Sequence, residues 1–245
     1  MMEKWSSEEL HARYEALEDN IKAVRFNIAE AAIQAGRKPE EVRLLAATKT
    51  VPAEVVNRAM ALGIDLIGEN RVQELNSKWD ELHREQAEIH LIGHLQTNKV
   101  AAVTGKVAMI ESIDSIRLAR AVSERSLALS ICTPVLVEVN IGEEESKSGI
   151  RAQELEKFLG EISEFPGISV RGIMSIPPIC DTKAEIRQIF YRLHKLFVDI
   201  RGKRIDNVSM DVLSMGMSGD YAEAVAEGAT LVRVGSSLFG PRQSH

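Results

Sequence analysis

Short apolar runs and longer helical stretches alternate along most of this chain. From Val42 onward the apolar runs predict strands over 42–48, 65–67, 89–92, 107–111, 134–140, 169–174, 208–213 and 230–234. The segments between them predict helices over 52–62, 71–86, 97–104, 115–129, 151–163, 182–201 and 218–227. Strands that alternate with helices in this way indicate parallel β/α units.

The number of predicted strands favours a closed barrel. Eight parallel strands close a TIM-type (β/α)8 barrel, whose usual size is about 250 residues. The main alternative is an open doubly wound sheet, which normally carries a Gly-x-Gly-x-x-Gly turn after its first strand. The corresponding segment here, Thr48-Lys49-Thr50-Val51-Pro52, has no glycine. Because the chain has no linker-like tract and no internal repeat, we expect one domain over 1–245, with the barrel at 42–240.

A long helix over 6–36 is predicted before the barrel. Ser6 and Ser7 are capping candidates, with Glu9 placed as in a capping box, and Gly36 favours the helix end. Apolar residues recur at alternating spacings of four and three, at Leu10, Tyr14, Leu17, Ile21, Val24, Ile28 and Ala31. Such a stripe suits packing against the barrel or a seam between two helices. We favour packing, and a monomer or weak dimer is expected.

Composition narrows the class of protein. The chain is 44% hydrophobic, but no apolar run approaches the roughly 20 residues of a membrane span, and the polar N-terminus has no secretory pattern. Cys132 and Cys180 have no paired spacing, so we expect neither a disulfide framework nor a zinc site, and a cytoplasmic location. The net charge of −6 argues against binding to nucleic acid.

Two glycine-serine loops near the end of the chain bracket one short predicted helix. Their serine hydroxyls and backbone N–H groups suit a phosphate dianion. The candidate residues are Ser214, Ser218, Gly219, Gly235 and Ser236. The alternative interpretation is a turn with Ser218 as an ordinary helix cap, but two such turns around one helix favour a binding site.

Lys49 is the candidate for covalent chemistry, because it follows the first predicted strand. Barrel enzymes place their sites at the carboxyl ends of strands. Partial burial there lowers a lysine pKa and favours a Schiff base with an aldehyde. A solvated loop lysine is the alternative. Together with the phosphate loops, Lys49 indicates a phosphorylated aldehyde, and pyridoxal phosphate is the leading candidate.

Other strand ends carry candidates of weaker individual meaning. Arg233 lies within the last strand, where it needs a partner: a structural salt bridge, or the ring nitrogen of a pyridine. Asn70 either binds a ligand or caps the next helix, and Met174 either contacts a ring or plugs the barrel. His90 and His94 have no metal-site spacing on a strand. After strand five come Glu138-Val-Asn140 and an acidic run interpreted as a solvated loop, where Lys147 offers a second amine.

Seven segments in order resemble the pyridoxal phosphate homeostasis protein family, from about residue 40 to Gly240. They are Leu44-Leu-Ala-Ala-Thr-Lys49, Gly68-Glu-Asn70, His90 to Lys99, Lys147-Ser-Gly149, Gly172 to Pro177, Leu213 to Asp220, and Val232-Arg-Val-Gly235. The resemblance implies the barrel of the alanine racemase N-terminal domain. It also implies that Lys49 holds the cofactor as an imine, Ser218, Gly235 and Ser236 bind its phosphate, Arg233 faces the pyridine nitrogen and Asn70 lines the ring.

Two functions remain open: a carrier that delivers pyridoxal phosphate to apoenzymes, as the resemblance implies, and an amino-acid racemase. A two-base racemase needs a second acid or base opposite the lysine. Tyr14, Tyr191 and Tyr221 all fall in predicted helices, and we expect no further domain after His245 to supply a tyrosine. The carrier is therefore favoured, with no catalytic residue and no metal. A purely structural barrel would leave the phosphate loops unexplained.

Overall fold

The computed structural model describes residues 7–142, 144 and 148–241, with side chains from Tyr14 onward. Eight of the strands in these ranges form a closed ring in the order β1–β2–β3–β4–β5–β7–β8–β9. Their bounds are β1 Arg43–Ala47, β2 Leu66–Glu69, β3 Glu88–Leu91, β4 Met109–Ile113, β5 Thr133–Asn140, β7 Ile168–Met174, β8 Val208–Ser214 and β9 Leu231–Val234. The short β6, Ile150–Arg151, pairs beside the end of β5.

Two pairings show that the sheet closes into a ring and leaves no edge strand among its eight strands. Strand β1 pairs with β9 over Arg43 to Ala46, and β4 pairs with β5 across a bulge between Ile110 and Ile113. Every pairing in the ring is parallel. The predicted TIM-type (β/α)8 barrel is thus confirmed, and the doubly wound alternative is excluded.

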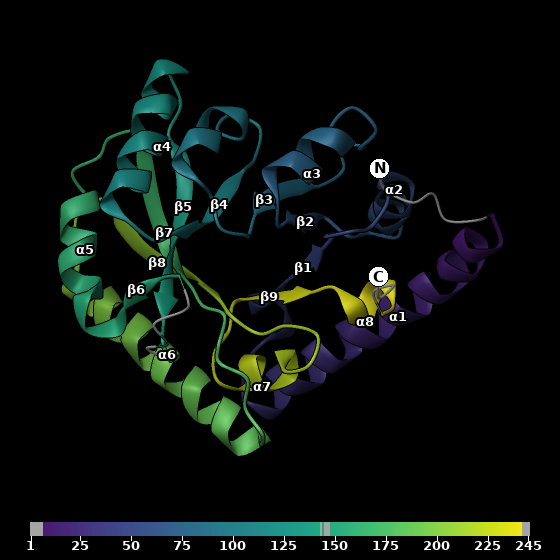
Figure 1. The fold of residues 1–245 in the computed structure, drawn as a ribbon. Coiled ribbons are helices and arrows are strands. Elements are labelled where there is room, and N and C mark those ends of the chain that lie inside the picture. The colour runs from purple at the N-terminus through teal and green to yellow at the C-terminus, as the bar shows by residue number, and fades with distance from the viewer. Residues whose placement is uncertain (1–6, 143, 145–147, 242–245) are drawn as a thin grey trace.

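Helices lie outside the ring (Figure 1). Their bounds are α1 Ser7–Gln34, α2 Ala53–Ala61, α3 Val72–Lys78, α4 Ile116–Ala128, α5 Leu155–Ile162, α6 Lys183–Lys203, α7 Tyr221–Ala226 and α8 Ser236–Phe239. Three 3-10 turns are η1 Pro39–Glu41, η2 Thr97–Ala102 and η3 Ala152–Glu154. Neither β6 nor α8 was predicted from the sequence, because both are too short to show a hydrophobic period.

Several predicted helix bounds were wrong. The helix predicted over 71–86 ends at Lys78, and turns follow it, because the Asn57 side chain holds the backbone of Glu81 and His83. The segment 97–104 forms the 3-10 helix η2. Helix α7 begins at Tyr221, since Asp220 rather than Ser218 precedes its first turn and accepts a hydrogen bond from the Met217 amide.

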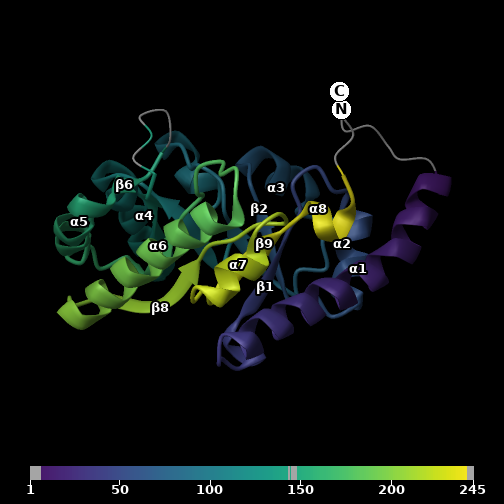
Figure 2. The same ribbon diagram turned by 90° about the horizontal axis from the view of Figure 1, so that it is seen from below.

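The predicted N-terminal helix is confirmed as α1, and its apolar stripe packs on the barrel domain. Leu17, Ile21, Val24 and Ile28 are all buried. The helix contacts α2, α7 and α8, and Figure 2 shows it running along the outside of these elements. Asn20 also donates a hydrogen bond to the Leu238 carbonyl at 2.9 Å. The predicted Ser6 cap and the Leu10 side chain lie outside what the structure describes.

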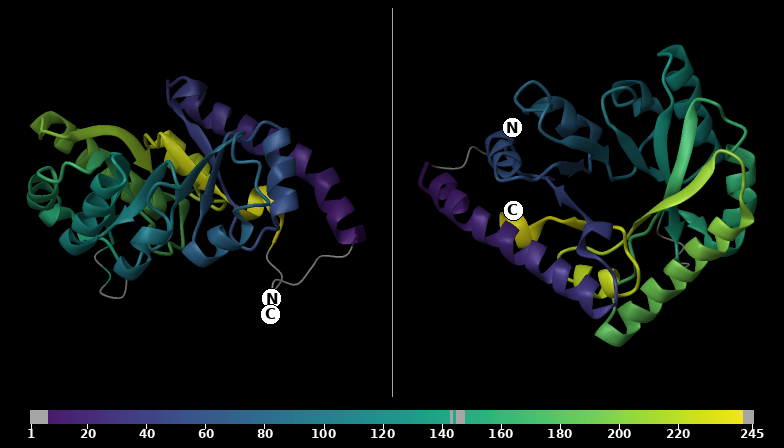
Figure 3. Two further views of the ribbon diagram at one scale, coloured as in Figure 1. Left: turned by 90° about the horizontal axis from the view of Figure 1, so that it is seen from above. Right: turned by 180° about the vertical axis from the view of Figure 1, so that it is seen from behind.

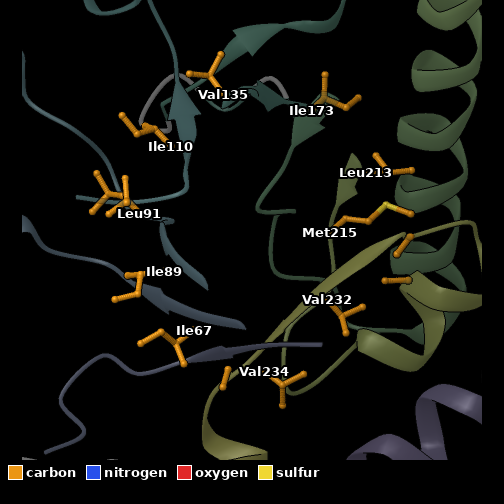
Figure 4. Close-up of a cluster of buried hydrophobic side chains, with 14 of the residues drawn as sticks. Ile67, Ile89, Leu91, Ile110, Val135, Ile173, Leu213, Met215, Val232 and Val234 are labelled. Carbon is orange, nitrogen blue, oxygen red and sulfur yellow. The ribbon is translucent and has the colours of Figure 1, made fainter. Parts of the chain in front are cut away.

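Successive strand residues separate into two apolar layers, because side chains alternate across a strand. The outer layer joins the ring to the helices, and Figure 4 shows part of it: Ile67, Ile89, Leu91, Ile110, Val135, Ile173, Leu213, Met215, Val232 and Val234. The smaller inner cluster consists of Leu45, Leu66, Ile92 and Leu231, with Ala47 and Val212 against it. The views in Figure 3 show the strands and the surrounding helices from above and from behind.

Among the helices of the described residues, none has both the length and the hydropathy of a membrane span. Cys132 and Cys180 do not form a disulfide with each other.

Candidate functional site

On several strands the inward side chains change from apolar to polar toward the carboxyl end, with Ile92 after β3 as an apolar exception. On β9, Leu231 belongs to the inner apolar cluster, and Arg233, two residues later, is buried on the same face. The same alternation places Ser214 after Val212 on β8, and Glu138 after Leu136 on β5. The polar half is the carboxyl end of the strands, which is the end where barrels of this type carry their sites.

Arg233 is held in place by hydrogen bonds inside the barrel. Its Nη1 donates to Ser214 Oγ at 2.6 Å, and its Nη2 donates to the Ser175 carbonyl at 2.8 Å. The Ser214 hydroxyl donates in turn to Glu111 Oε2 at 2.6 Å. The second oxygen of Glu111 lies 2.6 Å from His90 Nδ1. A buried chain therefore runs from His90 through Glu111 and Ser214 to Arg233.

Burial and neighbouring charges have opposite effects on the pKa values of Arg233 and Glu111 in this row of hydrogen-bonded side chains. Burial lowers the pKa of the Arg233 guanidinium, and the charges of Glu111, Glu138 and Asp220 oppose that change. Burial alone would raise the pKa of Glu111, but the hydrogen bond and charge of His90 and the charge of Arg233 bring that pKa below its ordinary value. Glu111 is therefore ionised, and Arg233 stays a cation beside it.

Lys49 and Gly235 stand at the ends of neighbouring strands. Strand β1 pairs with β9 in a register that puts Ala46 beside Val234. A Cβ on Gly235 would lie 3.2 Å from the Ala47 carbonyl oxygen, so the loop after β9 passes close to the end of β1. Lys49 is half-buried in the turn that follows β1. The predicted amine and the predicted phosphate loop are thus neighbours at one rim.

A buried charge cluster supports the turn that carries Lys49. Lys78 of α3 is 1% exposed, and its Nζ donates to Glu69 Oε1 at 2.9 Å and to Glu74 Oε1 at 2.7 Å. The same ammonium donates to the Thr48 carbonyl at 3.0 Å, and Thr48 Oγ1 donates to Glu69 Oε1 at 2.6 Å. The Thr50 amide donates to Glu74 Oε1 at 2.5 Å.

The cluster therefore fixes the backbone on both sides of Lys49. Thr50 has φ 64°, a left-handed conformation that a threonine rarely adopts. Burial raises the pKa of Glu69, while the Lys78 charge and the hydrogen bonds from Thr48 and Lys78 act in the opposite direction. Its Oε2 has no hydrogen-bond partner among the described residues.

The two glycine-serine loops meet at the hydroxyl of Ser218. The amides of Gly235 and Ser237 donate to Ser218 Oγ at 3.1 and 3.3 Å, and Ser237 Oγ donates to the Ser218 carbonyl at 3.3 Å. Two backbone donors thus converge on one oxygen atom, which is the arrangement that a phosphate oxygen requires. Gly219 and Ser236 lie exposed at the same rim. The residues fit a phosphate group.

The remaining predicted residues lie at different depths. Asn70 is half-buried after β2. A Cβ on Gly93 would lie 2.1 Å from the Asn70 carbonyl oxygen, so the loops after β2 and β3 are in contact. Asn70 does not cap α3, whose N-cap is Arg71. Met174 is fully buried. Ser214 is also fully buried and bonded within the Arg233 chain, so the phosphate site proposed below omits it.

The histidines belong to separate pairs. His90 pairs with Glu111, whereas His94 Nδ1 lies 3.1 Å from Asp114 Oδ2. No group of metal-binding side chains is present among the described residues. Lys147, the predicted second amine, lies outside the described residues.

Sequence reasoning missed the supporting charges. Glu69 is part of the segment Gly68-Glu-Asn70, but no role was predicted for it. Glu74, Lys78 and Glu111 were not predicted as site residues. One signal was available: Lys78 continues the buried spacing of Val72 and Leu75 along α3, and a lysine on the buried face of a helix requires a partner.

Comparison with known proteins agrees with this geometry. The family model of the alanine racemase N-terminal domain matches residues 20–243. The pyridoxal phosphate homeostasis protein of Aquifex aeolicus is 40% identical over 225 residues, which are 92% of this chain and 98% of that protein. The chain belongs to the pyridoxal phosphate homeostasis protein family. The resemblance inferred from seven sequence segments is thereby confirmed.

Solved structures of similar proteins extend the comparison. A protein of Bifidobacterium adolescentis superimposes with a TM-score of 0.89 at 38% identity, covering 97% of this chain and 98% of that one. PipY of Synechococcus elongatus with pyridoxal phosphate bound superimposes with a TM-score of 0.76 at 33% identity, covering 87% of this chain and 100% of that one. Both share the barrel of this family member.

Proposed function

We propose that this chain binds pyridoxal 5'-phosphate at the rim of its barrel and delivers it to apoenzymes as part of vitamin B6 homeostasis. The observation that carries the proposal is the PipY structure with pyridoxal phosphate bound, which is similar over 87% of this chain. The names of the relatives, which are pyridoxal phosphate homeostasis proteins, support the same function.

Every predicted residue except Ser214 has a role in this proposal. Lys49 forms a Schiff base with the aldehyde. Ser218, Gly219, Gly235 and Ser236 bind the phosphate, supported by the two amides that converge at the Ser218 hydroxyl.

Three residues contact the ring. Asn70 and Met174 line it, and Arg233 faces its nitrogen. When bound, the cofactor supplies an electrophilic aldehyde and a ring that can accept electrons. A permanent cation beside the ring nitrogen keeps that nitrogen unprotonated and weakens the electron acceptor.

A carrier fits these roles better than a racemase. The family name describes homeostasis, and Arg233 sits where it would weaken the ring as an electron acceptor. None of the tyrosines lies at a strand end: Tyr14 and Tyr191 lie within α1 and α6, and Tyr221 is buried at the start of α7. We place the protein in the cytoplasm, where the thiols of Cys132 and Cys180 stay reduced.

The test is an absorbance spectrum of the purified protein after addition of pyridoxal phosphate, with and without borohydride. Wild-type protein gains a visible imine band, and peptide mapping after borohydride reduction finds the cofactor on Lys49. Lys49→Ala loses the band. A double variant, Lys49→Ala with Lys147→Ala, controls for a substitute amine, and Lys106→Ala at the opposite end of the barrel behaves as wild type. A protein that stays colourless with excess pyridoxal phosphate would contradict the proposal.

The carrier and the racemase differ in a second measurement. Loaded wild-type protein incubated with L- or D-alanine in deuterium oxide leaves the α-proton in place, as proton magnetic resonance checks. Exchange of that proton, lost in Lys49→Ala, would establish the racemase instead.

A further inference from the structure

One buried carboxyl group has no place in the carrier described so far. Glu138 lies on β5, which stands four strands from β1 in either direction around the ring. Alternation along β5 directs it into the barrel, because Val137 and Val139 belong to the outer layer. Glu138 therefore faces the rim from the side opposite the strand that leads to Lys49.

Glu138 is 9% exposed, and among the described residues no hydrogen bond to its carboxyl group is found. Its oxygens are not among the fully enclosed atoms that lack a partner, so the carboxyl group reaches solvent at the mouth of the barrel. The other inner carboxylate, Glu111, has both oxygens bonded to His90 and Ser214. A buried carboxyl group without a partner is costly, and such groups cluster at binding sites. The group is therefore placed to receive a ligand that donates hydrogen bonds.

The charged groups around Glu138 come from three strand ends. Burial raises its pKa, and Asp114 after β4 adds to that effect, whereas His94 after β3 and Arg233 of β9 act against it. His94 and Asp114 pair with each other at 3.1 Å. The carboxyl group can therefore take up a proton more readily than an exposed glutamate.

We propose that Glu138 binds the primary ammonium group of an incoming acceptor and removes its proton. This proposal rests on the proposed function, since it concerns how the cofactor leaves Lys49. An acceptor lysine has a pKa of about 10.4 and is protonated at neutral pH, so it cannot attack an aldehyde carbon as it arrives. The ligand class is a primary amine: an amino acid, or the lysine side chain of an apoenzyme.

The transfer balances in protons and bonds. The Glu138 carboxylate takes one proton from the acceptor ammonium, giving a carboxylic acid and a neutral amine. The acceptor nitrogen would form a double bond to the carbon that Lys49 holds as the double bond from that carbon to the Lys49 nitrogen breaks, and the two remaining N–H protons of the acceptor would pass to the Lys49 nitrogen. The proton on Glu138 would pass through solvent at the mouth to the departing Lys49 amine, which becomes an ammonium group in place of the acceptor's, and Glu138 returns to its carboxylate form.

The test compares wild type with Glu138→Gln, using Nα-acetyl-lysine amide as the acceptor. Loaded protein is mixed with the amine, and the cofactor still fixed to Lys49 by borohydride is measured over time. The amine-dependent rate falls about 100-fold in Glu138→Gln, within the usual contribution of a positioned acid or base. Glu138→Asp recovers part of it. The slow release into buffer without amine is unchanged.

A second readout uses the unloaded protein. Nα-acetyl-lysine amide raises the thermal midpoint of wild type and leaves that of Glu138→Gln unchanged. Glu88→Gln is the control, because Glu88 lies at the amino end of β3, away from the rim; this variant behaves as wild type in both assays. If wild type never fixes the cofactor on Lys49, the proposed function fails. Suppose instead that wild type does fix the cofactor on Lys49. The role of Glu138 is then overturned if Glu138→Gln exchanges the cofactor at the wild-type rate, or if the amine does not raise the thermal midpoint of unloaded wild type.

Discussion

The two halves of the barrel interior have the same strands and opposite chemistry. The amino-terminal half is filled by Leu45, Leu66 and Leu231, with Val212 against them. The carboxyl-terminal half contains Arg233 and Glu111 joined through Ser214. Only one residue, Val232, separates Leu231 from Arg233 on β9. A fold can thus devote one half to stability and the other to binding, because each side chain contributes mainly to its own layer.

This division predicts which substitutions affect stability, which affect binding, and which affect both. A third region, the charge cluster of Lys78, lies outside the ring but supports the turn of Lys49.

The largest effect is expected from Lys78→Met in that third region. The substitution leaves Glu69 and Glu74 buried without their cation, and removing one partner of a buried pair costs about 3–5 kcal/mol. Urea unfolding measures the loss, and borohydride trapping shows less cofactor on Lys49. The double variant Lys78→Met with Glu69→Gln removes one stranded charge and recovers part of the stability. Wild-type stability in Lys78→Met would show that the cluster carries no weight.

Leu66→Ala tests the apolar half. Deleting this fully buried side chain costs about 2–5 kcal/mol through lost burial and the cavity that remains. Because the residue lies below the polar layer, the affinity for pyridoxal phosphate and the imine spectrum stay at wild-type values when measured well below the unfolding temperature. A changed spectrum would mean that the two halves are coupled.

Ser218→Ala combined with Gly235→Asp tests the polar rim. The first removes the hydroxyl that joins the loops, and the second brings a carboxylate against an anion. We expect affinity for pyridoxal phosphate to fall about 100-fold, or roughly 2.7 kcal/mol, with little change in urea stability. Pyridoxal without its phosphate is the control ligand, and its binding changes less. Equal losses for both ligands would count against a phosphate site.

The smallest effect concerns the pH dependence of Glu111. Its pKa is below the ordinary value in the folded chain, so its ionised form stabilises the fold above the unfolded pKa, and this contribution is lost as the pH falls through the folded pKa. The difference in unfolding free energy between wild type and Glu111→Gln is therefore largest above about pH 4.5 and narrows under acid. Urea titrations at several pH values measure it. If the difference in unfolding free energy did not change with pH, the conclusion that Glu111 is ionised in the folded protein would be wrong.

The sequence predicted the outer layer of this fold better than its interior. Alternation of apolar runs with helices located the strands of the ring, because burial under helices leaves a clear apolar signal at Val135, Val137 and Val139. Bounds were lost where a side chain ends a helix, as Asp220 does ahead of α7. Lys49 and the loops at Ser218 and Gly235 were recognisable because they follow strands. Lys78 was not recognised, and Glu138 was noted at the end of strand five without a role, because the importance of each depends on the surroundings that the closed ring creates.

The apolar cluster inside the barrel has a consequence for how the proposed carrier would release its ligand. A ligand held at the carboxyl ends of the strands would have Leu45, Leu66 and Leu231 beneath it, so it would leave by the same rim through which it entered. A protein that received the ligand at that rim would also exclude solvent there, and direct transfer would then compete with release into water.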